Sequence, residues 1–130
     1  MTTTTLLGSI REHLDTFDLP EPWSVRVVSQ PIPGRGDVSV QLAADALPSV
    51  ASQLLAWVDT LTEVSSEVWR VYDGGSVHLG IRGRLADGTT VYVFDGVAYA
   101  DQFGVEPGEH RVVSLACVRE WASFDAEVAA

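Results

Sequence analysis

The sequence predicts a single α+β domain, with a mainly antiparallel sheet of about five strands and helices packed on one face. Two stretches place apolar residues three and four positions apart, as amphipathic helices do. Several short segments alternate apolar and polar residues, as half-buried strands do. Hairpin connections dominate the second half of the chain, which favours antiparallel pairing. We expect the element order α-β-β-α-β-β-β-α in one domain spanning residues 1–130, since 130 residues suit one core and not two.

The first helix is expected over about residues 4–17, where Leu6, Ile10 and Leu14 share one face. The preceding threonines can supply its N-cap oxygen, and the prolines of "DLPEPW" end it. The chain then predicts a strand, a turn-rich loop and a second strand, at residues 23–29, 30–37 and 38–42.

A central helix follows, with Asp45 as the expected N-cap and Pro48 in its first turn. Its apolar stripe is the clearest in the chain and comprises Leu47, Val50, Leu54, Val58 and Leu61. Three strands are expected next, at residues 67–72, 77–82 and 89–94. Asp87-Gly88 predicts a type I′ hairpin between the last two of these strands.

Residues 95–110 form a long irregular connection in this interpretation, and residues 111–113 are a candidate for one more short strand. Ser114 is the expected cap of a last helix that runs to about Ser123. The ends of the chain, about residues 1–4 and 124–130, are expected to be loose.

The composition is acidic, with 18 acidic residues, eight basic residues that are all arginine, and a net charge of -10. Such a surface disfavours direct binding of nucleic acid or of an anionic membrane, and it suits a basic protein partner. No apolar run is long enough to span a bilayer, and the start of the chain does not resemble a signal peptide. With a single cysteine, these features predict a cytoplasmic protein.

No catalytic residue, metal site or cofactor is predicted. His13, His78 and His110 have no second ligand at metal-binding spacing, so we expect them at surface or boundary positions. Cys117 lies near His110 in the sequence and in the first turn of a helix, which is the beginning of a cysteine nucleophile site. We nevertheless expect Cys117 to pack the last helix against the core.

The arginines concentrate on one predicted face of the sheet. If Val77, Leu79 and Ile81 point toward the helices, the period of two in a strand sends their neighbours outward. Extending this pattern to neighbouring strands, with Trp69 inward, predicts a binding face made of Arg26, Arg70, Tyr72, His78, Arg82, Arg84, Tyr92 and Phe94. Two interpretations stay open: a solvated face of cross-strand pairs, or a binding face, because arginine and tyrosine are enriched in binding hot spots.

Four segments together resemble small proteins of actinobacteria and of their phages or mobile elements: "DLPEPWSV", "VHLGIRGRLADGTTVYVF", "DGVAYADQFG" and "HRVVSLACVREWA". The resemblance covers about residues 18–123 and contains no catalytic signature. It implies an actinobacterial or phage source and an accessory role in the cytoplasm, and no functional residue is carried over from it.

The leading functional hypothesis is a non-enzymatic protein-binding or regulatory module that uses the outer sheet face and a loop with Tyr99 and Phe103. Its partner is expected to be a protein, either a second copy of the chain or a protein with a basic surface. In a phage, the natural form is an inhibitor of a host defence or nucleic-acid enzyme, acting through the acidic surface. The alternative is a small-molecule-binding protein or minor enzyme with a pocket between the 95–110 loop and the last helix.

Overall fold

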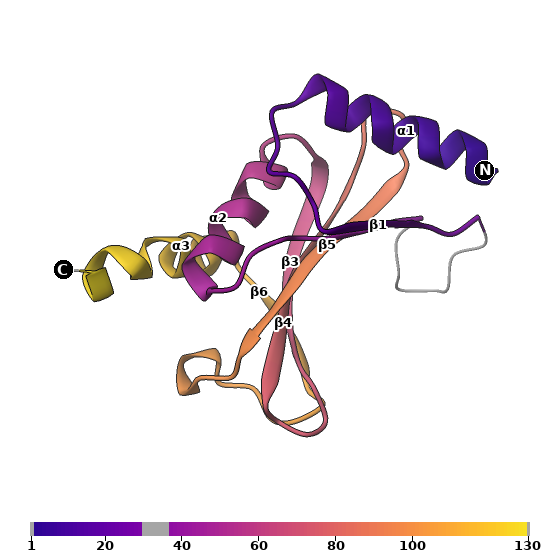
Figure 1. Cartoon of the computed structure of the whole chain (residues 1–130). Helices are drawn as coiled ribbons and strands as arrows, with labels where there is room; N and C mark the ends of the chain where they lie inside the picture. Colours follow the sequence, from indigo (N-terminus) through magenta and orange to yellow (C-terminus); the bar gives the residue numbers. More distant parts are fainter. Residues whose placement is uncertain (1, 30–36, 130) are drawn as a thin grey trace.

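Helices and a sheet segregate onto two layers in the computed structural model, which describes residues 2–29 and 37–129 (Figure 1). The helices are α1 (Thr3–Thr16), α2 (Leu47–Val58) and α3 (Leu115–Ala129). The strands are β1 (Ser24–Val27), β2 (Val38–Gln41), β3 (Thr62–Arg70), β4 (Ser76–Arg84), β5 (Thr90–Ala98) and β6 (His110–Val113). A short 3-10 helix, η1 (Asp101–Phe103), precedes β6. The α+β class and the predicted order are confirmed, with the candidate strand at 111–113 present as β6.

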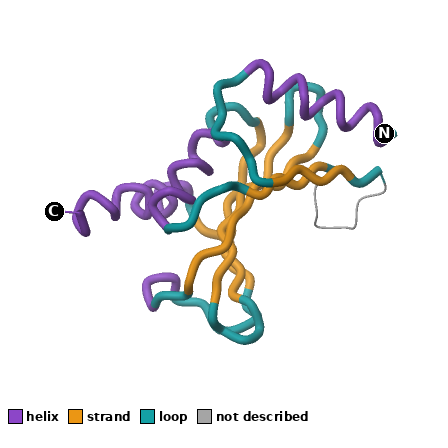
Figure 2. Tube along the Cα trace, viewed as in Figure 1, coloured by secondary structure: helices purple, strands orange, loops and turns teal. Residues whose placement is uncertain are grey.

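The six strands of the described residues lie in the order β1-β2-β5-β4-β3-β6. Every neighbouring pair is antiparallel except β2 and β5, which are parallel. This mixed arrangement arises because α2 carries the chain away from β2, and the meander β3-β4-β5 then returns to it. The sheet twists strongly, so that in Figure 2 the β1-β2 pair runs across the view while β3 and β4 run down it.

The three helices all cover the same face of the sheet, as predicted. Figure 1 shows α2 and α3 together on one side of the twisted strands, with α1 above β1. The core between the layers joins the inward residues of the central strands to α1, α2 and α3; its members with at most 1% exposure include Val40, Leu79, Ile81, Val93, Val50, Leu54 and Trp57. Each such side chain contributes about 1.5–3 kcal/mol by leaving water.

The helix starts follow the expected capping chemistry at two of three sites. The hydroxyl of Thr2 accepts a hydrogen bond from the Thr5 amide at 3.1 Å and begins α1, and that of Ser114 accepts one from the Cys117 amide at 3.2 Å. The prediction of Asp45 as the N-cap of α2 was wrong, because Ala46 occupies that position and makes no side-chain cap. Pro48 lies in the first turn and has no amide proton for a cap to bind.

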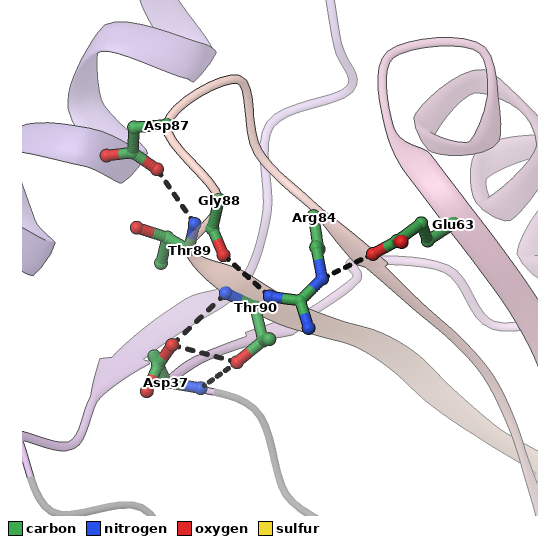
Figure 3. A network of polar contacts seen from close by, with 7 residues as sticks. All are labelled: Asp37, Glu63, Arg84, Asp87, Gly88, Thr89 and Thr90. Atoms are coloured by element: carbon green, nitrogen blue, oxygen red, sulfur yellow. Dashed lines mark hydrogen bonds and ion pairs between the residues drawn. The ribbon is translucent and has the colours of Figure 1, made fainter.

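The β4-β5 hairpin is present, but its turn is not type I′. A type I′ turn needs positive φ at both central residues, and among the described residues only Gly88 of this turn has it, at +90°. Leu85 and Thr89 close a three-residue loop, in which the Leu85 amide donates to the Thr89 carbonyl at 2.8 Å. Asp87 stabilises the loop by accepting a hydrogen bond from the Thr89 amide at 2.9 Å (Figure 3).

The parallel pair β2-β5 is anchored at its start by Asp37 and Thr90. The Asp37 amide donates to the Thr90 hydroxyl at 3.0 Å, while the Thr90 amide donates to the Asp37 carboxylate at 3.1 Å (Figure 3). These reciprocal bonds set the register that places Ser39 beside Tyr92. Asp37 is the last residue of the predicted 30–37 loop, and residues 30–36 lie outside the described part of the chain.

The predicted irregular connection at 95–110 is partly strand, because β5 continues to Ala98. Asp95 points toward the helix layer with 6% exposure and accepts a hydrogen bond from the Ala44 amide at 3.1 Å. Beyond β5, Phe103 is 5% exposed and packs edge-on against Trp121 of α3, with ring centroids 5.2 Å apart. The two rings thus pack against each other between the loop after β5 and α3, the region in which the alternative hypothesis expects a pocket.

The prediction that Arg70 points to the outer face was wrong. The register pairs Trp69 with His78 and Arg70 with Val77, so Trp69 faces outward and Arg70 faces the helix side. The guanidinium of Arg70 lies 3.5 Å from the ring centroid of Tyr99. It also donates to the carbonyls of Gly74 and Val105, each at 3.0 Å. Arg70 thus joins the β3-β4 turn to the loop after β5.

His13 is buried, with 4% exposure, and not at the predicted surface or boundary position. Its ring stacks on Trp57 with centroids 5.5 Å apart, and Nε2 lies 2.9 Å from the Thr60 hydroxyl oxygen. Thr60 uses its own proton to bind the Trp57 carbonyl at 2.7 Å, so the histidine nitrogen is the donor to it. Burial lowers the pKa of His13 below its ordinary value of 6.5.

Acid is therefore expected to loosen the packing of α1. Because the pKa of His13 is lower in the folded state, its contribution to stability is full above pH 6.5 and declines as the pH falls from 6.5 through the folded pKa. We expect His13→Gln, which does not titrate, to lose less stability than the wild type between about pH 7.5 and 5.5. Urea unfolding at both pH values measures this difference, and equal losses in the two proteins would contradict it.

Candidate ligand-binding groove

The outer face of the sheet, opposite the helices, forms a groove of about 360 Å³. The cross-strand register arranges this face in rows of side chains that run across the strands. The groove is lined by Ser24, Arg26, Ser39, Gln41, Glu67, Trp69, His78, Arg82, Tyr92, Phe94 and His110. These residues come from all six strands, so the concave shape depends on the twist of the whole sheet.

Five ring-bearing side chains form the floor of one half of the groove, called here the aromatic half: His110, Trp69, His78, Phe94 and Tyr92. Neighbouring rings contact each other in sequence. The centroid distances are 5.3 Å from His110 to Trp69, 5.1 Å from Trp69 to His78, 6.0 Å from His78 to Phe94 and 5.1 Å from Phe94 to Tyr92. The ring planes lie within 16° of each other between His110 and Trp69 and along His78, Phe94 and Tyr92, whereas Trp69 meets His78 edge-on at 66°. The row therefore offers a flat ligand two ring surfaces of different orientation.

Gly80 allows the Tyr92 ring to lie across β4. A Cβ atom at this position would meet a ring carbon of Tyr92 at 2.4 Å, which is closer than real side chains approach. Gly96 has a milder role, because a Cβ there would lie 3.5 Å from the His78 ring, an ordinary contact. The depth of the groove at Tyr92 therefore depends on the missing side chain at position 80.

Arg82 is held in place by two neighbours in the groove. Its guanidinium lies 3.0 Å from a carboxylate oxygen of Glu67 and 4.4 Å from the ring centroid of Tyr92. Glu67 is the only carboxylate among the residues that line the groove. The pair is partly shielded from water, with side-chain exposures of 34% and 21% for Arg82 and Glu67. The two contacts hold the positively charged Arg82 side chain at one side of the groove, next to the rings.

Polar side chains from β1 and β2 form the other half of the groove, called here the polar corner: Ser24, Arg26, Ser39 and Gln41. The register places Arg26 beside Ser39 and Ser24 beside Gln41. Among the side chains that the structure describes, Arg26 has no carboxylate within ion-pair distance. Among the described residues, the groove thus contains two guanidinium groups and one carboxylate, although the whole chain carries a net charge of -10.

His78 lies at the centre of the aromatic half and is half-buried. Burial lowers its pKa below 6.5, and the negative charge of Asp95 opposes that change. The ring is therefore mainly neutral at pH 7 and acts as an uncharged part of the floor.

The structure brings five of the predicted face residues together in the groove: Arg26, His78, Arg82, Tyr92 and Phe94. Arg84 lies on the same face but beyond the groove, where it binds the Glu63 carboxylate and donates to the Gly88 carbonyl at 3.0 Å (Figure 3).

The other predicted binding residues lie elsewhere. Arg70 and Tyr99 contact each other on the helix side, and Phe103 is buried, so the loop containing Tyr99 and Phe103 does not present both rings to a partner. Tyr72 follows β3 in a turn, where it is 83% exposed and does not line the groove.

Sequence reasoning missed Trp69, Glu67 and His110, together with the polar residues Ser24, Ser39 and Gln41. Glu67 and Trp69 alternate with the buried Ser66 and Val68. A prediction with Val68 pointing inward on β3 would therefore have placed both residues on the outer face. His110 could be found only from the pairing of β6 with β3, which joins distant parts of the chain.

Cys117 and His110 do not form a nucleophile site. His110 pairs with Trp69 and lines the groove, whereas Cys117 packs against the core from α3, on the helix side of the sheet. Burial and the charge of Glu120 raise the pKa of the Cys117 thiol, which disfavours the reactive thiolate. The expectation that Cys117 packs the last helix is confirmed.

Metal clusters and membrane-spanning helices are both absent from the described part of the chain. No group of three or more His, Cys, Asp or Glu side chains there is arranged to hold a metal ion. None of the described helices is long and apolar enough to cross a membrane.

Comparison with protein-family models, curated proteins and solved structures finds no match to this chain. The actinobacterial or phage origin therefore stays a prediction, and function has to be inferred from the groove.

Proposed function

We propose that this protein is a binding module whose outer-face groove captures a ligand with a flat aromatic group. The observation that carries the proposal is the continuous row of rings across four strands, from His110 to Tyr92. A flat ligand ring that lies against this row would displace water from the aromatic surface of the groove.

The size and composition of the groove support a small ligand or a single side-chain group of a partner. Ligand pockets in proteins typically enclose about 300–1,000 Å³ and combine an apolar lining with a few polar groups. The groove, at about 360 Å³, is at the small end of this range. Its tryptophan, tyrosine and arginine residues are also the types enriched in binding hot spots.

Binding and not catalysis is proposed because the carboxylate of the groove is already paired with an arginine and its two histidine rings pack within the row of rings. Glu67 binds Arg82, and the rings of His78 and His110 both contact Trp69. The protein partner, the homodimer and the inhibitor acting through an acidic surface stay predictions, since the described contacts bear on none of them.

Removing the Trp69 ring is expected to lower the affinity for aromatic ligands about five- to 150-fold, because stacking on one ring contributes about 1–3 kcal/mol. The probes are 2-naphthamide and 2-naphthoate, and their affinities for the wild type and Trp69→Ala are measured by ligand-observed NMR. Trp23→Ala is the matched control, since Trp23 is 72% exposed and does not line the groove. Absence of binding to the wild type, or equal binding by both variants, would contradict the proposal. Circular dichroism verifies that both variants are folded.

A further inference from the structure

We infer that the ligand of the groove is an anion, a flat aromatic carboxylate or phosphate whose charged group binds Arg26 in the polar corner. This inference rests on the proposed binding function and identifies the class of ligand.

The groove is divided chemically between its two halves. Every ring of the lining belongs to β3, β4, β5 or β6, whereas the lining residues of β1 and β2 are two serines, a glutamine and an arginine. A ligand that fills both halves must therefore have one flat apolar end and one end that accepts hydrogen bonds. The polar corner can donate several hydrogen bonds to one acceptor group, because its residues lie side by side on paired strands.

Arg26 differs from Arg82 in what it already binds. Arg82 is bonded to Glu67 and lies over Tyr92, so its charge is largely balanced inside the groove. Arg26 has no such carboxylate among the described side chains, and the hydroxyls of Ser24 and Ser39 next to it have no hydrogen-bond partner there either. These donors are available to a ligand.

The charge of the polar corner favours an anion over a neutral acceptor. A guanidinium group binds carboxylate and phosphate oxygens through parallel, charge-assisted hydrogen bonds. Arg26 thus presents a positive charge on a chain whose net charge is -10. A neutral ligand in the same place would cover the Arg26 charge without pairing it, which costs binding free energy.

The spacing of the strands accommodates a ligand of this kind. Two strand spacings separate β1 from β5, because β2 lies between them, which places the backbones of Arg26 and Tyr92 about 10 Å apart. The Arg26 side chain shortens this gap, so a ring stacked near Tyr92 and Phe94 needs only a directly attached or short-linked anionic group to reach it.

The test compares 2-naphthoate and 2-naphthyl phosphate with the neutral 2-naphthamide, in titrations of wild type, Arg26→Gln, Arg82→Gln and Arg11→Gln. Arg11→Gln is the matched control, because it removes the same charge from the exposed face of α1, where Arg11 pairs with Asp15. We expect the wild type and Arg11→Gln to bind at least one of the two anions about tenfold more tightly than the amide. Arg26→Gln is expected to lose that preference while binding the amide as before. The two anions distinguish a carboxylate from a phosphate ligand.

The outcomes separate this inference from the function on which it rests. If the wild type binds the amide and both anions equally, the groove binds rings but the anion inference is wrong. If the preference persists in Arg26→Gln and disappears in Arg82→Gln, Arg82 holds the anion and the assignment to Arg26 is overturned. If no naphthyl compound binds, the proposed function itself fails.

Discussion

Replacement of Arg70 by methionine is expected to lower the free energy of unfolding by about 2–4 kcal/mol. The guanidinium of Arg70 supplies hydrogen bonds to the carbonyls of Gly74 and Val105 and a cation-π contact to Tyr99. Methionine fills similar space but offers no donor, so both carbonyls lose a charged partner. The β3-β4 turn and the loop after β5 are then no longer joined.

Arg82→Met is the matched control for this stability change. Arg82 also binds one carboxylate and one ring, but it does so on the open face with 34% side-chain exposure. Partly exposed ion pairs contribute at most about 1 kcal/mol, so we expect a small effect on urea unfolding. Equal losses of unfolding free energy in the two variants would contradict the placement of Arg70 on the helix side of β3.

Gly80→Ala is expected to weaken binding of 2-naphthoate about tenfold or more while lowering stability by only about 1–3 kcal/mol. A methyl group at position 80 collides with the Tyr92 ring, whose nearest atom would be 2.4 Å away. The ring belongs to a side chain and can move, and the open direction is into the groove. The displaced Tyr92 ring would then occupy the volume that the ligand needs, and it would lose its contact with the Arg82 guanidinium.

Gly96→Ala is the control for Gly80→Ala, because it adds the same methyl group to the same face in an ordinary contact with His78. We expect its affinity for 2-naphthoate to stay within about threefold of the wild type. Titration calorimetry of both variants gives the affinities, and thermal unfolding verifies the fold. Unchanged binding in Gly80→Ala would mean that Tyr92 does not shape the site.

The elements with one unambiguous apolar face were predictable from the sequence. In α2 the buried Val50 and Leu54 repeat at helical spacing, and in β4 the buried Val77, Leu79 and Ile81 alternate with more polar residues. For such segments, burial of the apolar set leaves only one orientation.

The prediction failed where both faces of a strand carry large side chains. In β3, Val68 and Trp69 are adjacent, so hydrophobicity alone does not select which of them faces the core. An irregularity between Thr62 and Ser65, with positive φ at Glu63, also interrupts the pairing of β3 with β4. The orientation of Arg70 followed from the wrong choice for Trp69.

The groove itself depends on pairings between distant segments. Ser39 approaches Tyr92 only because β2 pairs in parallel with β5, and His110 approaches Trp69 only because β6 pairs with β3. Local periodicity contains no information about these neighbours. The sequence could therefore predict individual outward residues of β1, β4 and β5, including Arg26, but not the serines and the glutamine that complete the polar corner around it.

The indole resonances of the four tryptophans provide the most direct test of the site. In a two-dimensional ¹H-¹⁵N spectrum titrated with 2-naphthoate, we predict that the Trp69 indole signal shifts, while those of Trp23, Trp57 and Trp121 stay in place. Trp69 lies in the groove, whereas Trp121 packs on Phe103 beside the loop after β5. A shift at Trp121 with Trp69 unchanged would move the site to the helix side of the sheet and contradict the account.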